Sequence, residues 1–324
     1  MALISCDDCG NDVSKNAKEC PNCGAPVRQS ARYADKNFGQ IENELDSKEK
    51  ITIETDKIKP YKWLAMTNAA ILLTIIVLSG GETDFGAILI IIGLGAVVPF
   101  AMLYLSKWLA IKSHKIRMLT ENNLSNDAEK QLIKIVTRLS TRAGLDVIPE
   151  IGIYESDEMN AFATGKNKED SLIAFSSQLL CQMDEDAIAA VAAHELAHIA
   201  NGDMVTMTMV QAAVNAVVLL VTLPLMALKV FAFFSEDFGW VEFIVVSIIK
   251  FIVVTVMLFL GNLIVKAFSR KREFEADKLA ATILDPKRMI HALNALNSQE
   301  EIPTPKGQLS YASLKISSPP AIMD

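Results

Sequence analysis

The sequence lacks an excess of basic residues, because its 31 Lys and Arg are outnumbered by 38 Asp and Glu and the formal net charge is −7. No basic domain stands out, which argues against nucleic acid as the main partner. A cleavable signal peptide is also not expected, since the first residues belong to a cysteine motif. Cysteine itself is scarce, at five residues, and we expect the isolated Cys181 to be a buried apolar residue rather than a nucleophile.

The other four cysteines form two copies of one motif, each a Cys-x-x-Cys pair followed by glycine: Cys6, Cys9 and Gly10, then Cys20, Cys23 and Gly24. The glycine permits a tight turn, and four thiolates on two turns can close a tetrahedral structural zinc site. We therefore predict a zinc ribbon over residues 1–27, with disulfides as the alternative. Nearby acidic residues favour a protein partner for the ribbon over a nucleic acid.

Hydrophobic residues make up 51% of the sequence, and its mean hydropathy is +0.29. Four apolar stretches are long enough to cross a bilayer: 63–79, 85–105, 205–234 and 240–265. The connections inside each pair of stretches, at 80–84 and 235–239, are acidic, whereas basic residues flank the pairs. The positive-inside rule then places both termini and the soluble core in the cytoplasm, and predicts a multi-pass protein of the cytoplasmic membrane.

A run without Gly or Pro at 186–194 predicts a helix, which leads into His194-Glu195-Leu196-Ala197-His198. At a spacing of four residues, the two imidazoles lie on one face of the helix and can bind the same zinc ion. Glu195 is then placed to reach a water on that zinc. The alternative, two surface histidines at helical spacing, is disfavoured because the flanking Ala and Val residues indicate burial.

A catalytic zinc keeps three protein ligands and one open position, so a third ligand must come from another segment. The helical stretch 269–277 contains Glu273, which we assign as this ligand. Asp277 lies four residues further on the same face, so we expect it to accept the free ring N–H of a ligand histidine. The alternative is that Glu273 belongs to a charged, solvated helix face.

The soluble region before the third apolar stretch is predicted to contain a helix and a small sheet. The helix runs from near Asn126 to Arg142, with Ser125 as its N-cap. Three short strands follow it: 148–154, 160–163 and 171–175.

One of these strands is a candidate substrate site, because an extended peptide can pair with a sheet edge and lie across the metal. We nominate the segment 160–165 as this edge. Its expected substrate-binding residues are Asn160, Ala161 and Phe162. An ordinary hairpin is the alternative.

These motifs together resemble a known family, the HtpX-type integral-membrane zinc metalloproteases, which are related to the CaaX prenyl-protein peptidases. The resemblance extends over about 157–281 and includes 159–165, 194–206 and 269–277. It implies that His194, His198 and Glu273 bind catalytic zinc. It also implies that Glu195 activates the water, that the Asn160 segment lies along the substrate cleft, and that the protein acts in membrane-protein quality control.

The chain departs from this family in two places. The N-terminal ribbon is an addition to the usual plan. Where relatives often carry His-Pro-Pro followed by a basic residue, this chain reads Ser318-Pro319-Pro320.

The predicted fold is an α+β membrane protein, mostly helical, with four transmembrane helices, a zincin-like protease core containing a small β-sheet, and an N-terminal zinc ribbon. After the ribbon at 1–27, the predicted segments are a polar linker at 28–60, two transmembrane helices at 61–106, protease core at 107–203, two more transmembrane helices at 204–266, and core again at 267–324. The expected cofactors are one catalytic and one structural zinc ion. The expected partners are membrane-protein or unfolded polypeptide substrates, the lipid bilayer and a protein that binds the ribbon.

The predicted activity is that of a zinc-dependent metalloendopeptidase, with Glu195 as the general base. Arg270 and His291 are the candidate oxyanion donors, with a lipid phosphate as the alternative contact of Arg270 and helix packing as the alternative role of His291. Three other functions are weighed. Four spans are too few for the lipid chamber of a CaaX-type prenyl-protein peptidase, Glu195 argues against a catalytically silent zinc-ribbon scaffold, and the few basic residues of the ribbon argue against a tethered nucleic-acid binder.

Overall fold

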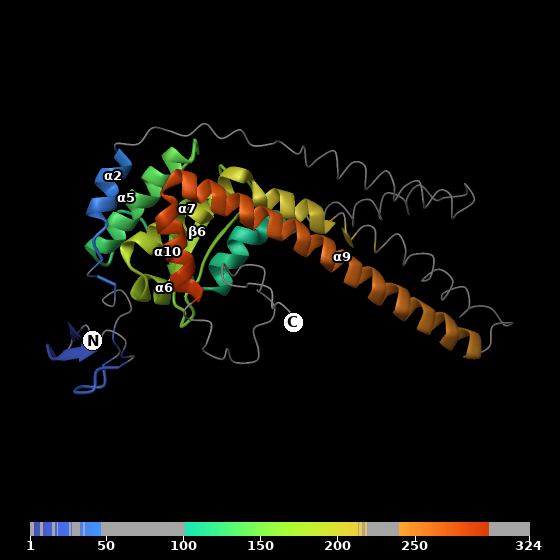
Figure 1. The fold of residues 1–324 in the computed structure, drawn as a ribbon. Helices are drawn as coiled ribbons and strands as arrows, with labels where there is room; N and C mark the ends of the chain where they lie inside the picture. The colour runs from blue at the N-terminus through green and yellow to red at the C-terminus, as the bar shows by residue number, and fades with distance from the viewer. Residues whose placement is uncertain are drawn as a thin grey trace. The chain divides into compact units, whose positions relative to one another are not determined.

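The computed structural model describes residues 3–6, 9–14, 17, 19–25, 27, 33–34, 36–46, 101–212, 214–215, 218 and 240–297 (Figure 1). The first apolar stretch and most of the second and third lie outside these residues, as does the C-terminal segment from 298 onward. The expectations for those parts of the chain therefore stay predictions.

The chain divides into two compact units, each built from segments that are far apart in the sequence. The first unit comprises 1–54, 106–202 and 275–324. The second comprises 55–105 and 203–274, and so contains the predicted membrane stretches.

The N-terminal ribbon contains a two-stranded antiparallel sheet, in which β1 (Leu3–Ser5) pairs with β2 (Asp12–Ser14). In each cysteine motif the glycine N–H donates to the carbonyl of the first cysteine, at 2.9 Å for Gly10 and 2.8 Å for Gly24. Both glycines have a left-handed φ, 69° and 73°, which a residue with a side chain rarely adopts. The two motifs are therefore structural copies of each other.

Residues 33–34 and 36–46 lie in the segment expected as a polar linker, and the structure packs them against the protease core. We call these residues the strap. Its helix α2 (Gly39–Asp46) lies beside α5 (Asp127–Arg142), as Figure 1 shows. Four apolar side chains of the strap are buried: Tyr33, Phe38, Ile41 and Leu45. The strap also contacts Glu185, because the Asn37 backbone N–H donates to the Glu185 carboxylate at 3.1 Å.

The prediction that Ser125 caps helix α5 is wrong, because the helix begins one residue later than such a cap requires. The side chain of Asn126 accepts the Glu129 backbone N–H at 2.9 Å and is the N-cap. Ser125 instead donates its own backbone N–H to the Glu129 carboxylate at 2.8 Å. Asparagine and serine both cap helices well, so the sequence alone does not separate adjacent candidates.

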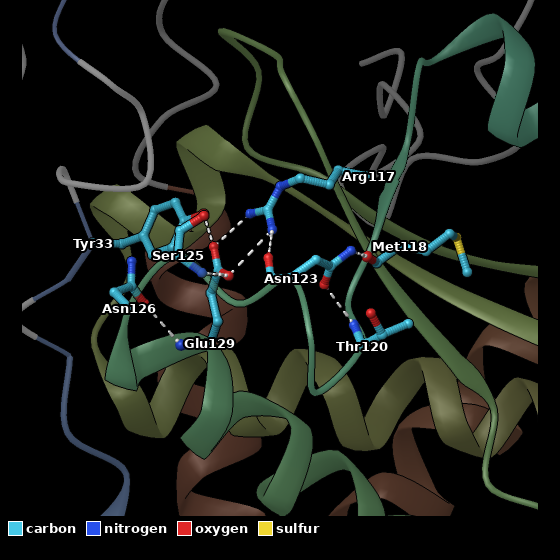
Figure 2. Close-up of polar contacts among 8 residues, drawn as sticks. All are labelled: Tyr33, Arg117, Met118, Thr120, Asn123, Ser125, Asn126 and Glu129. Carbon is cyan, nitrogen blue, oxygen red and sulfur yellow. Dashed lines mark hydrogen bonds and ion pairs between the residues drawn. The ribbon is translucent and has the colours of Figure 1, made fainter.

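The Glu129 carboxylate is the centre of a buried polar network that joins the strap to the core (Figure 2). Tyr33 donates its hydroxyl to Glu129 at 2.8 Å, and Arg117 donates two guanidinium N–H groups at 2.5 and 3.2 Å. Burial alone would raise the pKa of Glu129, but the hydrogen bonds from Arg117, Ser125 and Tyr33 hold it below its usual value. Burial, reinforced by the charge of Glu129, raises the pKa of Tyr33.

A four-stranded mixed sheet in the first unit has the order β3-β4-β6-β5. Its strands are Arg117–Met118 (β3), Glu150–Tyr154 (β4), Ala161–Gly165 (β5) and Ser171–Ser176 (β6). β4 and β6 are parallel, and β3 and β5 run antiparallel to their neighbours. The three predicted strands are present with bounds shifted by up to two residues, whereas the two-residue β3 was not predicted because it is too short to show a pattern.

β5 ends in a tight return to β6, and this return requires glycine. Gly165 has φ 146°, and a Cβ there would collide with the carbonyl oxygen of Asp170. Gly165 stands opposite Ser171 in the register of the two strands. The first unit also contains α6 (Ser177–Gln182) after β6, α7 (Glu185–Asn201), α10 (Pro286–Asn297), which packs on α7, and most of a helix at 101–113.

Helix α9 (Trp240–Ile283) continues without interruption for 44 residues. Within the part of the chain that the structure describes, its segment Phe243–Ile283 is the one helix long and apolar enough to cross a membrane. The predicted fourth stretch, 240–265, lies inside α9. Many apolar side chains of this stretch are exposed, such as Phe251. Glu273 lies further along the same helix, so the predicted membrane span and the third ligand belong to one continuous helix.

Candidate metal centre

Helix α7 carries the two histidines and has well-defined ends. The Asp184 side chain accepts the Ala187 N–H at 2.8 Å and caps the first turn. Gly202, with φ 73°, ends the helix in the left-handed conformation. The helix is buried on nearly all sides, as its Ala-rich sequence predicted, so His194 is an interior residue and His198 is half-buried.

The two histidine rings face each other in a geometry suited to one metal ion. His194 is 2% exposed, and its Nε2 atom lies 3.1 Å from Nε2 of His198. Two nitrogen ligands on a tetrahedral zinc, each about 2.0–2.1 Å from the metal, stand roughly 3.3 Å apart. The observed separation fits this value, and the two rings lie edge to face with their planes at 87°.

The third predicted ligand completes this group. One ligand atom from each of His194, His198 and Glu273 lies within 4.8 Å of the others, so the three side chains could hold a metal ion. Asp277, one turn beyond Glu273 on α9, has Oδ1 2.8 Å from Nδ1 of His194. A carboxylate on the outer ring nitrogen fixes the tautomer that leaves Nε2 for the metal. A group of two His and one Glu is the set that catalytic zinc uses.

Glu195 lies between the two histidines in the sequence and is 4% exposed. Burial is the main cause of the raised pKa of Tyr154 on β4, and the charge of Glu195 adds to it. Tyr154 donates its hydroxyl to the Asn160 carbonyl at 3.5 Å. Tyr154 therefore stays protonated, and its place near Glu195 was not predicted from the sequence.

An ion pair next to the metal ligands was also not predicted. Arg272, the residue before Glu273, pairs with Asp203, the residue after the α7 cap, and both side chains are largely buried. Lys168 donates its ammonium to the Ala200 carbonyl in the last turn of α7. A cation at a helix C-terminus is favourable, so Lys168 stabilises the end of the helix that carries His198.

One of the two candidate oxyanion donors, His291, is held away from the metal group. His291 has Nε2 2.6 Å from Asp184 Oδ2, at the start of α7. Asp184 precedes His194 by ten residues, which is about 15 Å along a helix. Burial alone would raise the pKa of Asp184, but the Ala187 N–H and His291 hold it below its usual value. Arg270 is exposed on α9, three residues before Glu273, and its role as an oxyanion donor stays a prediction.

The segment nominated as the substrate edge lies at the edge of the described sheet, because β5 pairs with β6 and no other described strand. Asn160 is tied down by two hydrogen bonds with Ser176, at 2.9 and 3.0 Å. Ala161 and Phe162 are buried, and Phe162 packs in the cluster around Leu172. The side chains of Ala161 and Phe162 are therefore core residues, which is a correction to their assignment as substrate-binding side chains, and their contribution to peptide binding would come from the backbone.

The four ribbon cysteines form a second group that could hold a metal ion. Sγ of Cys6 lies 3.7 Å from that of Cys23, and Sγ of Cys9 lies 3.6 Å from that of Cys20. Sulfur ligands at about 2.3 Å from a tetrahedral zinc stand roughly 3.8 Å apart, whereas a disulfide needs about 2.05 Å. The spacing fits zinc, and all four cysteines are free. Hydrogen bonds from the backbone N–H groups of Asn22 and Cys23 lower the pKa of Cys20 to about 7.

The family model for peptidase family M48 matches residues 126–313. The Protease HtpX homolog of Bacillus velezensis is 40% identical over 263 residues, which cover 78% of this chain and 87% of that protein. The Protease HtpX homolog of Bacillus subtilis is 41% identical over 239 residues, covering 73% and 78%. The crystal structure of S. mikatae Ste24p aligns with a TM-score of 0.45 and 21% identity, over 79% of this chain and 61% of that chain.

Proposed function

The chain belongs to peptidase family M48 as an HtpX-type membrane metalloprotease, and from this premise we propose that it cleaves misfolded or damaged membrane proteins in quality control. The observation that supports the chemistry most directly is the His194–His198–Glu273 group, which has the donor set and the nitrogen spacing of a catalytic zinc site.

In this proposal His194, His198 and Glu273 hold the metal. Zinc supplies a Lewis acid for the scissile carbonyl and lowers the pKa of a water molecule. Glu195 takes a proton from the attacking water and passes it to the leaving amine, so no covalent intermediate with the protein is needed. Asp277 orients the ring of His194, and its contact at 2.8 Å supports this role.

The proposed substrate is an extended polypeptide that adds to the edge strand β5. The backbone groups of β5 that face away from β6 supply hydrogen bonds that do not depend on the substrate's sequence. A protease that removes damaged proteins needs such tolerance, because its substrates share a conformation rather than a sequence.

The ribbon is proposed to hold a structural zinc and to recruit a protein partner. The match to the family begins at residue 126, well after the ribbon, which supports a function separate from catalysis. The intact chain is expected to bind two zinc ions, one of which exchanges faster because a catalytic site keeps an open position.

The test is cleavage of casein by the purified full chain in detergent, before and after treatment with a chelator and again after zinc is restored. Cleavage should stop on chelation and return with zinc. A Cys23→Ser variant is the control, because it weakens the ribbon site and should leave cleavage intact. Cleavage that persists in metal-free protein would overturn the proposed mechanism.

A further inference from the structure

The helix at 101–113 has one face that belongs to the protein core. Ala110 and Ile111 pack against the buried cluster of the four-stranded sheet. Lys107 forms ion pairs with Asp170 at 2.6 Å and Glu150 at 2.8 Å. These contacts fix the part of the helix that lies in the first unit, and they fix which side of it faces outward.

The outward face is apolar and aromatic, although it is exposed. Trp108 is 55% exposed and Leu109 45% exposed, and one turn earlier Tyr104 and Leu105 are exposed as well. At 100° per residue these four side chains and Lys112 occupy an arc of about 140°, opposite the core face. A helix on the surface of a soluble protein normally presents polar residues on such a face.

The basic residues near this face indicate which kind of partner covers it. Of the basic residues here, Lys107 and Arg117 are engaged with carboxylates of the core. Lys112 instead lies over the ring of Trp108, with its ammonium 4.7 Å from the ring centroid. Tryptophan and tyrosine together with a lysine that extends along them are typical of the boundary between lipid tails and head groups.

We infer that the exposed face of residues 104–112 lies in the membrane interface and holds the catalytic unit against the bilayer. The helix begins inside the predicted second membrane stretch, 85–105, and extends eight residues beyond it, so the face at 104–112 lies where the chain is predicted to leave the bilayer. Trp108 and Leu109 enter the head-group region, and Lys112 approaches the lipid phosphates. The sheet behind this helix then lies about one helix diameter, on the order of 10 Å, from the interface.

The inference is tested by the fluorescence of Trp108 in lipid vesicles, which does not depend on catalysis. The sequence has three tryptophans, so Trp63→Phe with Trp240→Phe leaves Trp108 alone. This variant is reconstituted in phosphatidylcholine and phosphatidylglycerol vesicles. Quenching is compared for a nitroxide at the head group, bromine deep in the acyl chain, and iodide in the water.

The head-group nitroxide should quench Trp108 more strongly than deep bromine or iodide. Quenching by iodide alone would place the face in water, and quenching by none of the probes would place it under protein, so either result overturns the inference. The control is a tryptophan-free chain with Val147→Trp, at an exposed site on the core, where iodide should be the effective quencher. If the double replacement does not fold, the wild-type signal minus that of Trp108→Phe gives the same comparison.

The predicted contact between Lys112 and the lipid phosphates can be tested in the same vesicles. Raising the phosphatidylglycerol content should strengthen the quenching of Trp108 by the head-group nitroxide, because anionic lipid attracts the lysine. In Lys112→Gln, added phosphatidylglycerol should no longer strengthen the quenching of Trp108. The head-group nitroxide should still quench Trp108 more strongly than deep bromine or iodide. An increment that survives the substitution would remove Lys112 from the proposed contact.

Discussion

Replacing Glu129 by Ala should destabilise the catalytic unit, because three donor groups lose this buried acceptor. The Tyr33 hydroxyl, the Arg117 guanidinium and the Ser125 N–H all donate to this buried carboxylate. The charge left behind is partly solvated, because the Arg117 side chain is 37% exposed, so the cost should lie below that of a fully buried ion pair, about 3–5 kcal/mol. The Tyr33→Phe change removes one hydrogen bond and should cost about 0.5–1.5 kcal/mol.

The assay is thermal unfolding of the full chain in detergent, followed by tryptophan emission at several pH values. Because the folded state lowers the pKa of Glu129, this carboxylate stabilises the protein above the pKa it has when unfolded, and that contribution is lost as the pH falls through the folded pKa. The difference between wild type and Glu129→Ala should therefore shrink in acid. Glu121→Ala, at an exposed position, is the control and should be nearly neutral. Equal melting temperatures for Glu129→Ala and the control would refute the reasoning.

Three further predictions concern the strap, the metal group and the topology. Deleting 1–30 should leave casein cleavage largely intact, whereas deleting 1–46 should lower the melting temperature because it removes four buried apolar side chains; equal stability of the two truncations would contradict the docking of the strap. Asp277→Asn should weaken zinc binding by about 10–100-fold in chelator competition, and unchanged affinity would remove Asp277 from its orienting role. A reporter fused after Asp84 should behave as non-cytoplasmic, and cytoplasmic behaviour would overturn the predicted topology.

The metal group could be predicted from the sequence because its chemistry leaves a short-range pattern. Two histidines four residues apart on an Ala-rich helix imply burial and a shared ligand, and that requirement led to Glu273 and Asp277 about 80 residues away. The structure brings the three ligand side chains within reach of one ion and sets Asp277 beside His194. The ribbon was predictable for the same reason, because its ligands repeat at a fixed spacing.

The contacts that were missed depend on long-range packing. The strap looked like a linker because the segment 28–60 that contains it is rich in charged residues, although Phe38, Ile41 and Leu45 recur at helical spacing and could have revealed a docked face. His291 was assigned by residue type alone, and nothing in the sequence shows that it lies beside Asp184.

The central claim, that this chain is a zinc protease with Glu195 as general base, is tested most directly by Glu195→Gln. The amide keeps the shape of the side chain but cannot accept the proton, while His194, His198 and Glu273 are unchanged. Zinc content should therefore match the wild type, and casein cleavage should fall by about 10²–10⁴-fold. Glu273→Gln is the matched comparison, because losing a charged ligand should lower zinc affinity itself. Wild-type cleavage by Glu195→Gln, in an assay where zinc-depleted wild type is inactive, would contradict the account.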